Sequence, residues 1–425
     1  MSHSLAIRGG EPSVATDSDS EVFRWPVIDG AAESRVLDVL HSHDFEGRGD
    51  VAAFEREFAG YCGAEYAVGQ ANGTSAILAA LWAVGVRRGT EVIVPTTTYW
   101  ASAMPARALG ARVIFADIQP TTLNIDPADV ARKITDRTRA IVPVHLLGYP
   151  ADMAELRSLA DSNGVAIVED AAHAHGSTYH GVRTGGLADV AAFSFHGKPI
   201  AAAEGGIVVT RHREIFERVL AWGQNFRLNP SEVSDPSLLR FAGLPMGGVT
   251  SRLHPIAAAL AREQLKHLDE RIDEVERAMQ YFWDGLAGIP FLHARRPPNG
   301  DRTMGAWYQP HGIYLTEAAQ GLSVNGFMRA IRAEGFPSQM RNIIREPLHL
   351  HPLFSVDVLD EERWATAEAP PATSSLPNAE RARAFSVPPF KRFDKTVIDG
   401  YIQLYRKVAD AYEELRSDDP GDVDL

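Results

Sequence analysis

Apolar residues follow two different spacings along the first two thirds of the chain. Around residues 74–86 they recur three and four positions apart, at Ile77, Leu78, Leu81 and Trp82, which is the spacing of one helix face. Elsewhere they form short uninterrupted runs between turn residues, which is typical of buried strands. Such runs predict strands at residues 92–95, 113–115, 140–144, 165–168, 190–195 and 207–209.

Helix-like segments separate these expected strands. Asp126 followed by Pro127 predicts a helix start, because an acid caps the first turn and proline fits its first position. Further helices are expected at residues 101–109 and at 152–163, the second closed by Gly164. Alternating strands and helices predict an α/β fold with a mostly parallel central sheet, whose chemistry belongs at the carboxyl ends of the strands.

The pattern changes after a long helix expected at about residues 255–286, with a possible break inside it. We therefore divide the chain into an N-terminal arm (1–44), a large domain (45–288) and a small C-terminal α+β domain (289–425). The later elements are a strand at 312–315, helices at 324–333 and 396–415, and a surface excursion at 360–377 that is rich in Pro, Ala, Ser and Thr.

Composition narrows the classes of protein that fit. The chain has 425 residues, of which 45% are hydrophobic and 23% charged, as in ordinary soluble proteins. Its net charge of −13, without a basic stripe, argues against nucleic acid as a partner. We expect no signal peptide, because the N-terminus lacks a basic region followed by an apolar core, and no membrane partner, because no apolar run is long enough to span a bilayer. A single cysteine, Cys62, excludes an intrachain disulfide and fits a reducing cytoplasm.

The stretch Asn72-Gly73-Thr74-Ser75 opens one of the expected helices. A helix N-terminus offers unpaired N–H groups and the positive end of the helix dipole, so it suits a phosphate group. Gly73 lets the backbone approach such a group closely. Taken alone, the same pattern also fits an ordinary capped helix.

A carboxylate ends the strand expected at residues 165–168. Asp170 and Ala172 lie two positions apart and project to one face, where a carboxylate can pair with a protonated ring nitrogen. The small Ala172 leaves room for a flat ring beside it. Alone, an aspartate in this place is more often a helix cap or a metal ligand.

The next expected strand ends in Ser194 and is followed by Lys198 among small and apolar residues. A lysine in such surroundings can form a Schiff base with an aldehyde, although a solvated surface lysine is the default. Ser194 can donate to a phosphate. Tyr99 and Trp100 follow the strand at residues 92–95, where an aromatic ring can stack on a cofactor. For Trp100 we expect packing in the core instead.

Each signal is weak alone, but together they occur in the order expected of one site. With these motifs the chain resembles the DegT/StrS-type sugar and aminocyclitol aminotransferases, which are fold-type I, aspartate-aminotransferase-like enzymes that use pyridoxal 5′-phosphate (PLP). The resemblance covers about residues 5–408. The stretches Gly9-Gly10-Glu11-Pro12 and Trp25-Pro26 are most similar to the subgroup that acts on keto-cyclitols and aminohydroxybenzoate precursors.

The resemblance implies roles for individual residues. Lys198 forms the Schiff base with PLP, Asp170 binds the pyridine nitrogen, and His173 lies near the phenolic oxygen of the cofactor. The other implied contacts are Tyr99 and Ala172 to the ring, Gly73, Thr74, Ser75 and Ser194 to the phosphate, and Arg252, His254 and Tyr308 to substrate. It also implies a homodimer with shared active sites. No metal is expected.

Three features depart from the family pattern. Thr250 stands where the partner subunit usually contributes an asparagine to the phosphate. One residue fewer separates Ser194 from Lys198, and Ala201-Ala202-Ala203 replaces the usual Thr-Thr-Gly. Lys198 and Asp170 are kept, so we expect cofactor binding to survive, whereas substrate recognition is less constrained.

The expected reaction is transfer of an amino group from L-glutamate or L-glutamine to a keto-cyclitol or keto-sugar in secondary metabolism. Another PLP-dependent reaction, such as dehydration, decarboxylation or carbon–carbon bond formation, remains open, as does a PLP-binding partner subunit without activity. A nicotinamide-dependent dehydrogenase is disfavoured, because no Gly-x-Gly-x-x-Gly motif follows the first strand.

Overall fold

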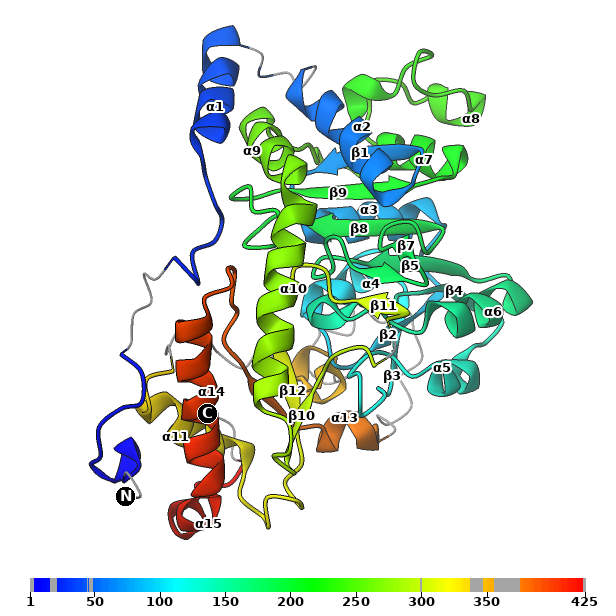
Figure 1. Ribbon diagram of the computed structural model, residues 1–425. Coiled ribbons are helices and arrows are strands. Elements are labelled where there is room, and N and C mark those ends of the chain that lie inside the picture. Colours follow the sequence, from blue (N-terminus) through cyan, green and yellow to red (C-terminus); the bar gives the residue numbers. More distant parts are fainter. Residues whose placement is uncertain are drawn as a thin grey trace.

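The computed structural model describes residues 4–15, 21–43, 45, 49–298, 300–336, 347–354 and 375–422. Parts of the expected N-terminal arm, and most of the excursion expected at 360–377, lie outside these ranges. A seven-stranded sheet forms the centre of the larger part of the molecule (Figure 1). Its strands lie in the order β1 (Tyr66–Gln70), β9 (Gly206–Thr210), β8 (Val190–Ser194), β5 (Ala166–Asp170), β4 (Thr138–Ile141), β2 (Glu91–Pro95) and β3 (Arg112–Ala116).

Only β9 runs against its neighbours in this sheet, since it pairs antiparallel with both β1 and β8. The pairs from β8 to β3 are all parallel. The prediction of a mostly parallel sheet is therefore confirmed. The six strands expected in this region are present, each within a few residues of its expected bounds.

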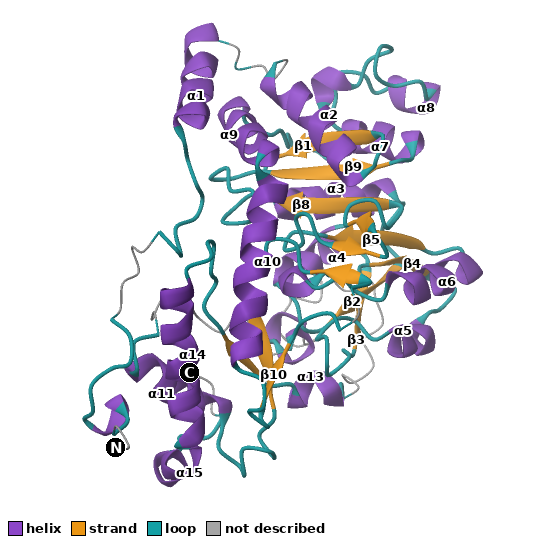
Figure 2. Ribbon diagram, in the orientation of Figure 1, coloured by secondary structure: helices purple, strands orange, loops and turns teal. Residues whose placement is uncertain are grey.

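Helices cover both faces of the sheet (Figure 2). Val92 and Val94 of β2 pack in a cluster with helix α3 (Gly73–Ala83), while Ile93 between them packs in another cluster with α6 (Met153–Asn163). Successive strand residues thus point to opposite sides, and each side is buried. The other helices of this part are α2 (Asp50–Cys62), α4 (Met104–Ala108), α5 (Pro127–Lys133), α7 (Arg213–Gly223) and α8 (Pro236–Leu239).

Local signals in the sequence set several helix ends. The side chain of Asp126 accepts a bond from the backbone of Ala128 at the start of α5, and Gly164 ends α6 at a φ of 63°. The long helix expected at 255–286 is broken at His267 into α9 (Pro255–Lys266) and α10 (Leu268–Gly285). The helix expected at 101–109 is shorter, because a 3₁₀ turn occupies Trp100–Ser102 before α4.

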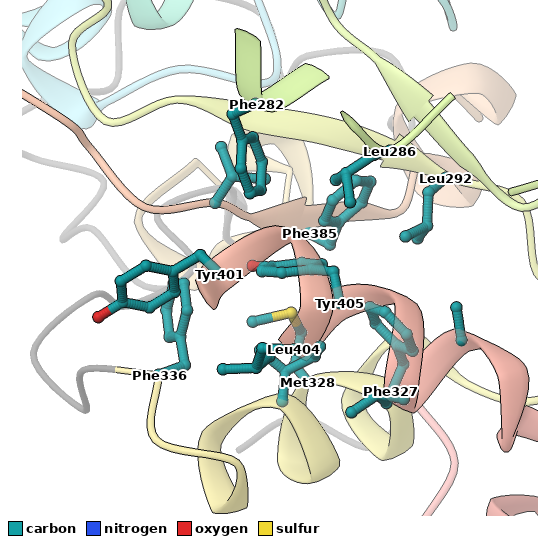
Figure 3. Close-up of a cluster of buried hydrophobic side chains, with 14 of the residues drawn as sticks. Phe282, Leu286, Leu292, Phe327, Met328, Phe336, Phe385, Tyr401, Leu404 and Tyr405 are labelled. Carbon is teal, nitrogen blue, oxygen red and sulfur yellow. The ribbon is translucent and has the colours of Figure 1, made fainter. Parts of the chain in front are cut away.

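A second apolar core lies in the C-terminal part, where α10 packs beside the last helices (Figure 3). Phe282 from α10, Phe327, Phe385 and Tyr405 meet there. The elements around it are strands β10 (Leu292–Ala294), β12 (His311–Tyr314) and β13 (Ala384–Ser386), and helices α11 (Val324–Ala333), α13 (Pro377–Arg381), α14 (Lys395–Asp410) and α15 (Tyr412–Leu415). These strands form an antiparallel sheet, which makes this part α+β.

The sequence did not predict β10 and β13, nor the small sheet of β6 (Thr178–Tyr179), β7 (Val182–Arg183) and β11 (Arg302–Thr303). All of them are two or three residues long, which is too short for a periodic pattern to show. Strand β1 was not predicted either, because Gly69 and Gln70 end its short apolar run. The exact domain boundaries stay a prediction.

The N-terminal segment passes along both parts of the molecule. Helix α1 (Gly30–Ser42) packs against α9, and Arg35 of α1 forms an ion pair with Asp50. Before it, Phe23 stacks on Phe390 at 5.7 Å between ring centres. In the described part of the chain, no helix is long and apolar enough to cross a bilayer.

Candidate active site

The candidate residues gather at the carboxyl ends of two parallel neighbours, β5 and β8. Asp170 is the last residue of β5, and Ser194 is the last residue of β8. Lys198 follows in the loop that leads from β8 to β9. Because parallel strands end at the same edge of a sheet, segments 24 or more positions apart in the sequence face one another here.

The start of α3 lies against the end of β8. The side chain of Asn72 caps the helix by accepting a 2.9 Å bond from the backbone of Ser75. A Cβ atom on Gly73 would lie 2.6 Å from the Cβ of Ser194, closer than two such atoms can approach, so glycine is required for this packing. The packing brings the half-buried Thr74 and Ser75 and the hydroxyl of Ser194 to one helix N-terminus, where N–H groups lack helical partners.

Asp170 is held by two bonds and is only 5% exposed. The hydroxyl of Ser102 donates to one carboxylate oxygen at 2.7 Å, and the backbone of Ala172 donates to the other at 3.1 Å. Because the Ser102 proton is used in this bond, the 2.8 Å contact between Thr98 and Ser102 is a bond donated by Thr98. Burial raises the pKa of Asp170, although both bonds and the charge of Lys198 oppose that rise.

Lys198 points its amine at an aromatic side chain from the C-terminal part. Nζ donates a 2.9 Å bond to the hydroxyl of Tyr308 and lies 4.2 Å from the centre of that ring. Burial lowers the pKa of Lys198 to about 8, while the charges of Asp170 and Tyr99 act in the opposite direction. Burial also raises the pKa of Tyr308 to about 12, so its phenol is neutral near pH 7.

The ring of His173 packs on the ring of Tyr308. The two rings are stacked, with centres 4.5 Å apart and planes 28° apart. Nδ1 of His173 accepts a 3.3 Å bond from the backbone of Leu147, so the ring proton is on Nε2. Burial, together with the charge of Lys198, holds the pKa of His173 well below its ordinary value. The imidazole is therefore neutral.

A second histidine, His175, was missed by the sequence analysis. It is 1% exposed, its Nδ1 accepts from the backbone of Ile200 at 3.3 Å, and its Nε2 donates to the carbonyl of Ser194 at 3.1 Å. His175 thus joins residues on either side of Lys198, the end of β8 and the middle of the loop. Burial lowers its pKa to about 3, which keeps this bonding pattern over the working pH range.

Tyr99 and Trp100 lie beside each other, with ring centres 5.0 Å apart, and are 59% and 43% exposed. The expectation that Trp100 packs in the core is therefore wrong. The 3₁₀ turn at this point buries Ala101 and Ser102 and leaves the tryptophan side chain outside.

The remaining predicted substrate and phosphate contacts lie elsewhere in the chain. Thr250, Arg252 and His254 line a separate hollow of about 1210 Å³, together with Glu55, Gln224, Phe226 and Arg227. The guanidinium of Arg252 lies 5.4 Å from the ring centre of Phe226. Nδ1 of His254 accepts from the backbone of Ile256, which makes it the N-cap of α9. Within one chain, only Tyr308 of the three predicted substrate residues contacts Lys198.

The arrangement suits a flat, phosphorylated aldehyde. The aldehyde would meet the amine of Lys198, a ring nitrogen would meet Asp170, and a phosphate would meet the first turn of α3. Asp170 and Lys198 are close enough to interact electrostatically, so the residues that would meet the ring nitrogen and the aldehyde belong to one site.

Comparison with known proteins gives concordant matches. The sequence profile of the DegT/DnrJ/EryC1/StrS aminotransferase family matches residues 26–383. The GDP-perosamine synthase of Caulobacter vibrioides is 37% identical over 80% of this chain and 89% of its own. The L-glutamine:2-deoxy-scyllo-inosose aminotransferase of Streptomyces fradiae is 34% identical over 79% and 80%. The crystal structure of 3-amino-5-hydroxybenzoic acid synthase, 28% identical, superimposes with a TM-score of 0.76 over 93% of this chain and 99% of its own.

Proposed function

Because the chain belongs to the DegT/DnrJ/EryC1/StrS aminotransferase family, we propose that it moves an amino group from L-glutamate or L-glutamine to the ketone of a keto-cyclitol or keto-sugar. The enzyme is a PLP-dependent aminotransferase, as its family implies. The observation that supports the proposal best is the half-buried amine of Lys198, placed between Tyr308 and Asp170.

The residues present fit PLP. The close packing of Gly73 on Ser194 brings the Ser194 hydroxyl to the N-terminus of α3, where the phosphate would bind. The carboxylate of Asp170, held by Ser102 and Ala172, would face the pyridine nitrogen. When bound, PLP withdraws electrons from the carbon that carries the amine. A cation against Asp170 would also offset the desolvation that raises the pKa of this carboxyl.

The reaction needs a base that also acts as an acid, and Lys198 suits both tasks. With a pKa of about 8, a sizeable share of its amine is neutral near neutral pH. Nζ would accept the proton from the carbon that gives up the amine, which is the α-carbon of the donor in the first half of the reaction, and would deliver it to the carbon that receives the amine. Tyr308 would fix the position of Nζ, and the neutral His173 would donate its Nε2 proton to an oxygen beside the ring.

The acceptor class rests on the relatives. One is named for a GDP-linked amino sugar and another for 2-deoxy-scyllo-inosose, a cyclitol ketone. The second name also contains L-glutamine as the donor. We infer from such relatives a role in secondary metabolism, and we keep both acceptor classes in the proposal.

A homodimer is part of the proposal. Phe226 and Leu244 are 75% and 69% exposed, and they belong to the same stretch as Thr250 and Arg252. Exposed apolar side chains of this size are typical of an interface. We propose that a second copy covers them and that Thr250 and Arg252 then serve the site of the partner, since in their own chain they line a different hollow.

The proposal is tested by the visible absorption of the purified protein with PLP, before and after addition of L-glutamate or L-glutamine. Bleaching by one amino acid supports transamination and identifies the donor. A visible absorption that neither amino acid changes would contradict both proposed donors. In parallel, borohydride should trap PLP on the wild-type protein and on Lys391→Met, which removes another lysine of pKa about 8, but not on Lys198→Ala. A trapped adduct in Lys198→Ala would overturn the assignment of Lys198.

A further inference from the structure

The backbone of Lys198 is bonded to the N-terminal segment. The indole Nε1 of Trp25 donates a 3.0 Å bond to the carbonyl oxygen of Lys198 itself. The two residues are 173 positions apart, so the bond draws the start of the chain onto the loop between β8 and β9. Trp25 belongs to the Trp25-Pro26 motif, to which the proposed function gives no role.

The segment before Trp25 is fixed to the C-terminal part of the molecule. The backbone N–H of Lys391 donates a 2.7 Å bond to the carbonyl of Val22. The ring of Phe23 stacks on Phe390 with planes 24° apart and meets the edge of Tyr401 at 5.7 Å. Residues 22–25 therefore form a strap, anchored at one end by the C-terminal part and at the other by the carbonyl of Lys198.

Two cations fix the orientation of the Trp25 ring. The ammonium of Lys391 lies 5.3 Å, and the guanidinium of Arg271 5.7 Å, from the ring centre. Cations at this distance are attracted to an aromatic face, more strongly when they are removed from water. Lys391 is partly buried, and this burial lowers its pKa to about 8, so it is mainly a cation only below that pH. A ring held in this way directs its N–H group along one line, toward Lys198.

We propose that Trp25 is a positioning residue for Lys198, and that the strap at residues 22–25 fixes the peptide of Lys198 so that its amine is directed at Tyr308 and Asp170. The other anchors of the loop act on its flanks, since His175 bonds Ser194 and Ile200, and Gln264 bonds Ala201. Trp25 acts on the lysine residue itself. The inference rests on the proposed function, in which Lys198 is the amine that takes up PLP.

The test compares the apoprotein of Trp25→Phe with the wild type. Phenylalanine keeps an aromatic face for the two cations and removes only the N–H donor. The rate at which PLP is captured, followed by visible absorption and by borohydride trapping on the Lys198 peptide, is measured from pH 7 to pH 10.5. Trp283→Phe is the matched control, because the indole nitrogen of Trp283 is buried without a hydrogen-bond partner among the described residues.

We expect capture by Trp25→Phe at pH 8 to be about fivefold slower, and the difference to vanish near pH 10.5. A loop released from the strap lets water reach the amine, so the pKa of Lys198 rises from about 8 toward its usual 10.5. A rise of about one unit lowers the neutral fraction of the amine at pH 8 by about fivefold. Trp283→Phe should follow the wild type. Lys391→Met removes one cation and keeps the N–H, so its rate should shift in the same direction by a smaller factor.

Capture by Trp25→Phe at the wild-type rate would overturn the inference, as would a loss of the same size at every pH. If Trp25→Phe does not fold, as judged by its thermal transition, the rate of PLP capture by Lys391→Met is used instead. An unchanged rate in that variant would contradict the positioning role of the strap. The trapping experiment on Lys198→Ala separates the two proposals. If PLP is still trapped on Lys198→Ala, the proposed function is refuted. If Lys198→Ala loses the adduct but Trp25→Phe captures PLP at the wild-type rate, only the positioning role of Trp25 is refuted.

Discussion

Lys198 Nζ and the hydroxyl of Tyr308 are joined by a 2.9 Å hydrogen bond between residues 110 positions apart. Lys198 comes from the loop after β8, whereas Tyr308 precedes β12 in the C-terminal part. The bond therefore links the two parts of the molecule at the point where the chemistry is proposed. The ring of Tyr308 is in turn fixed by its stacking on His173.

Tyr308→Phe should lower kcat by about fivefold and change the KM for the amino donor less than twofold, because a bond of about 1 kcal/mol that orients Nζ is lost while the ring remains. An oxygen that accepts from an ammonium group favours its charged form, so the pKa of Lys198 should fall below about 8. Steady-state kinetics across pH check both effects. Tyr281→Phe, which loses a bond to Asp399, is the control, and an equal loss there would contradict a specific role for Tyr308.

Gly73→Ala should weaken PLP binding by at least about tenfold. The new methyl group would lie 2.6 Å from the Cβ of Ser194, so the first turn of α3 must move away from the end of β8. Fluorescence titration with PLP measures the effect. Gly60→Ala is the matched control, since a Cβ there meets no atom of the described chain within 4 Å. Gly73→Ala combined with Ser194→Gly removes the clash, and continued weak binding would then point to the lost hydroxyl.

His175→Phe should destabilise the protein by about 2–4 kcal/mol, because the carbonyl of Ser194 and the N–H of Ile200 lose their partner in a buried place. The surrounding rings of Phe58, Phe193 and Phe195 tolerate an aromatic ring of this shape. Urea unfolding measures the loss. Burial lowers the pKa of His175 to about 3, so between pH 8 and pH 5 only the unfolded chain protonates this histidine, and the loss should be smaller at pH 5 than at pH 8 by about 2 kcal/mol. A loss of the same size at both pH values would show that the pKa of His175 is not lowered in the folded protein.

Much of the fold followed from local pattern. Buried strands such as 92–95 are uninterrupted apolar runs, and Asp126 and Gly164 set helix ends through bonds within one turn. Part of the site followed by the same logic, because Asp170 and Ser194 end neighbouring parallel strands and must therefore meet. Sequence periodicity is sufficient for such features because each depends on only a few adjacent residues.

The remaining contacts of the site depend on residues far apart in the chain. Ser102 reaches Asp170 across 68 positions, and Trp25 reaches Lys198 across 173. No local spacing announces such a pair, and the helical pattern around the serine does not show which distant side chain it will meet. Trp100 was placed wrongly for a related reason, since its apolar side chain predicts burial, whereas the backbone turn there decides which side chains face inward.

The pH dependence of stability tests the environment of Lys198 without any cofactor. Its pKa is about 8 in the folded protein and about 10.5 when the chain is unfolded, so between these values the unfolded chain binds more protons. The folded apoprotein must therefore gain stability as pH rises from 8 to 10.5, while below pH 8 the penalty for the buried charge is constant. Methionine does not titrate.

Lys198→Met should accordingly be more stable than the wild type at pH 7. Its advantage should shrink by no more than about 3 kcal/mol as pH rises to 10.5, since each unit of pKa shift corresponds to about 1.4 kcal/mol and the amine is only partly buried. At pH 10.5 the wild type should be slightly more stable than Lys198→Met, because the variant lacks the bond to Tyr308. Urea unfolding of both apoproteins at four pH values measures the gap. A gap that stays constant from pH 7 to 10.5 would mean that the amine is solvated, and a solvated lysine has no depressed pKa with which to act as a base near neutral pH.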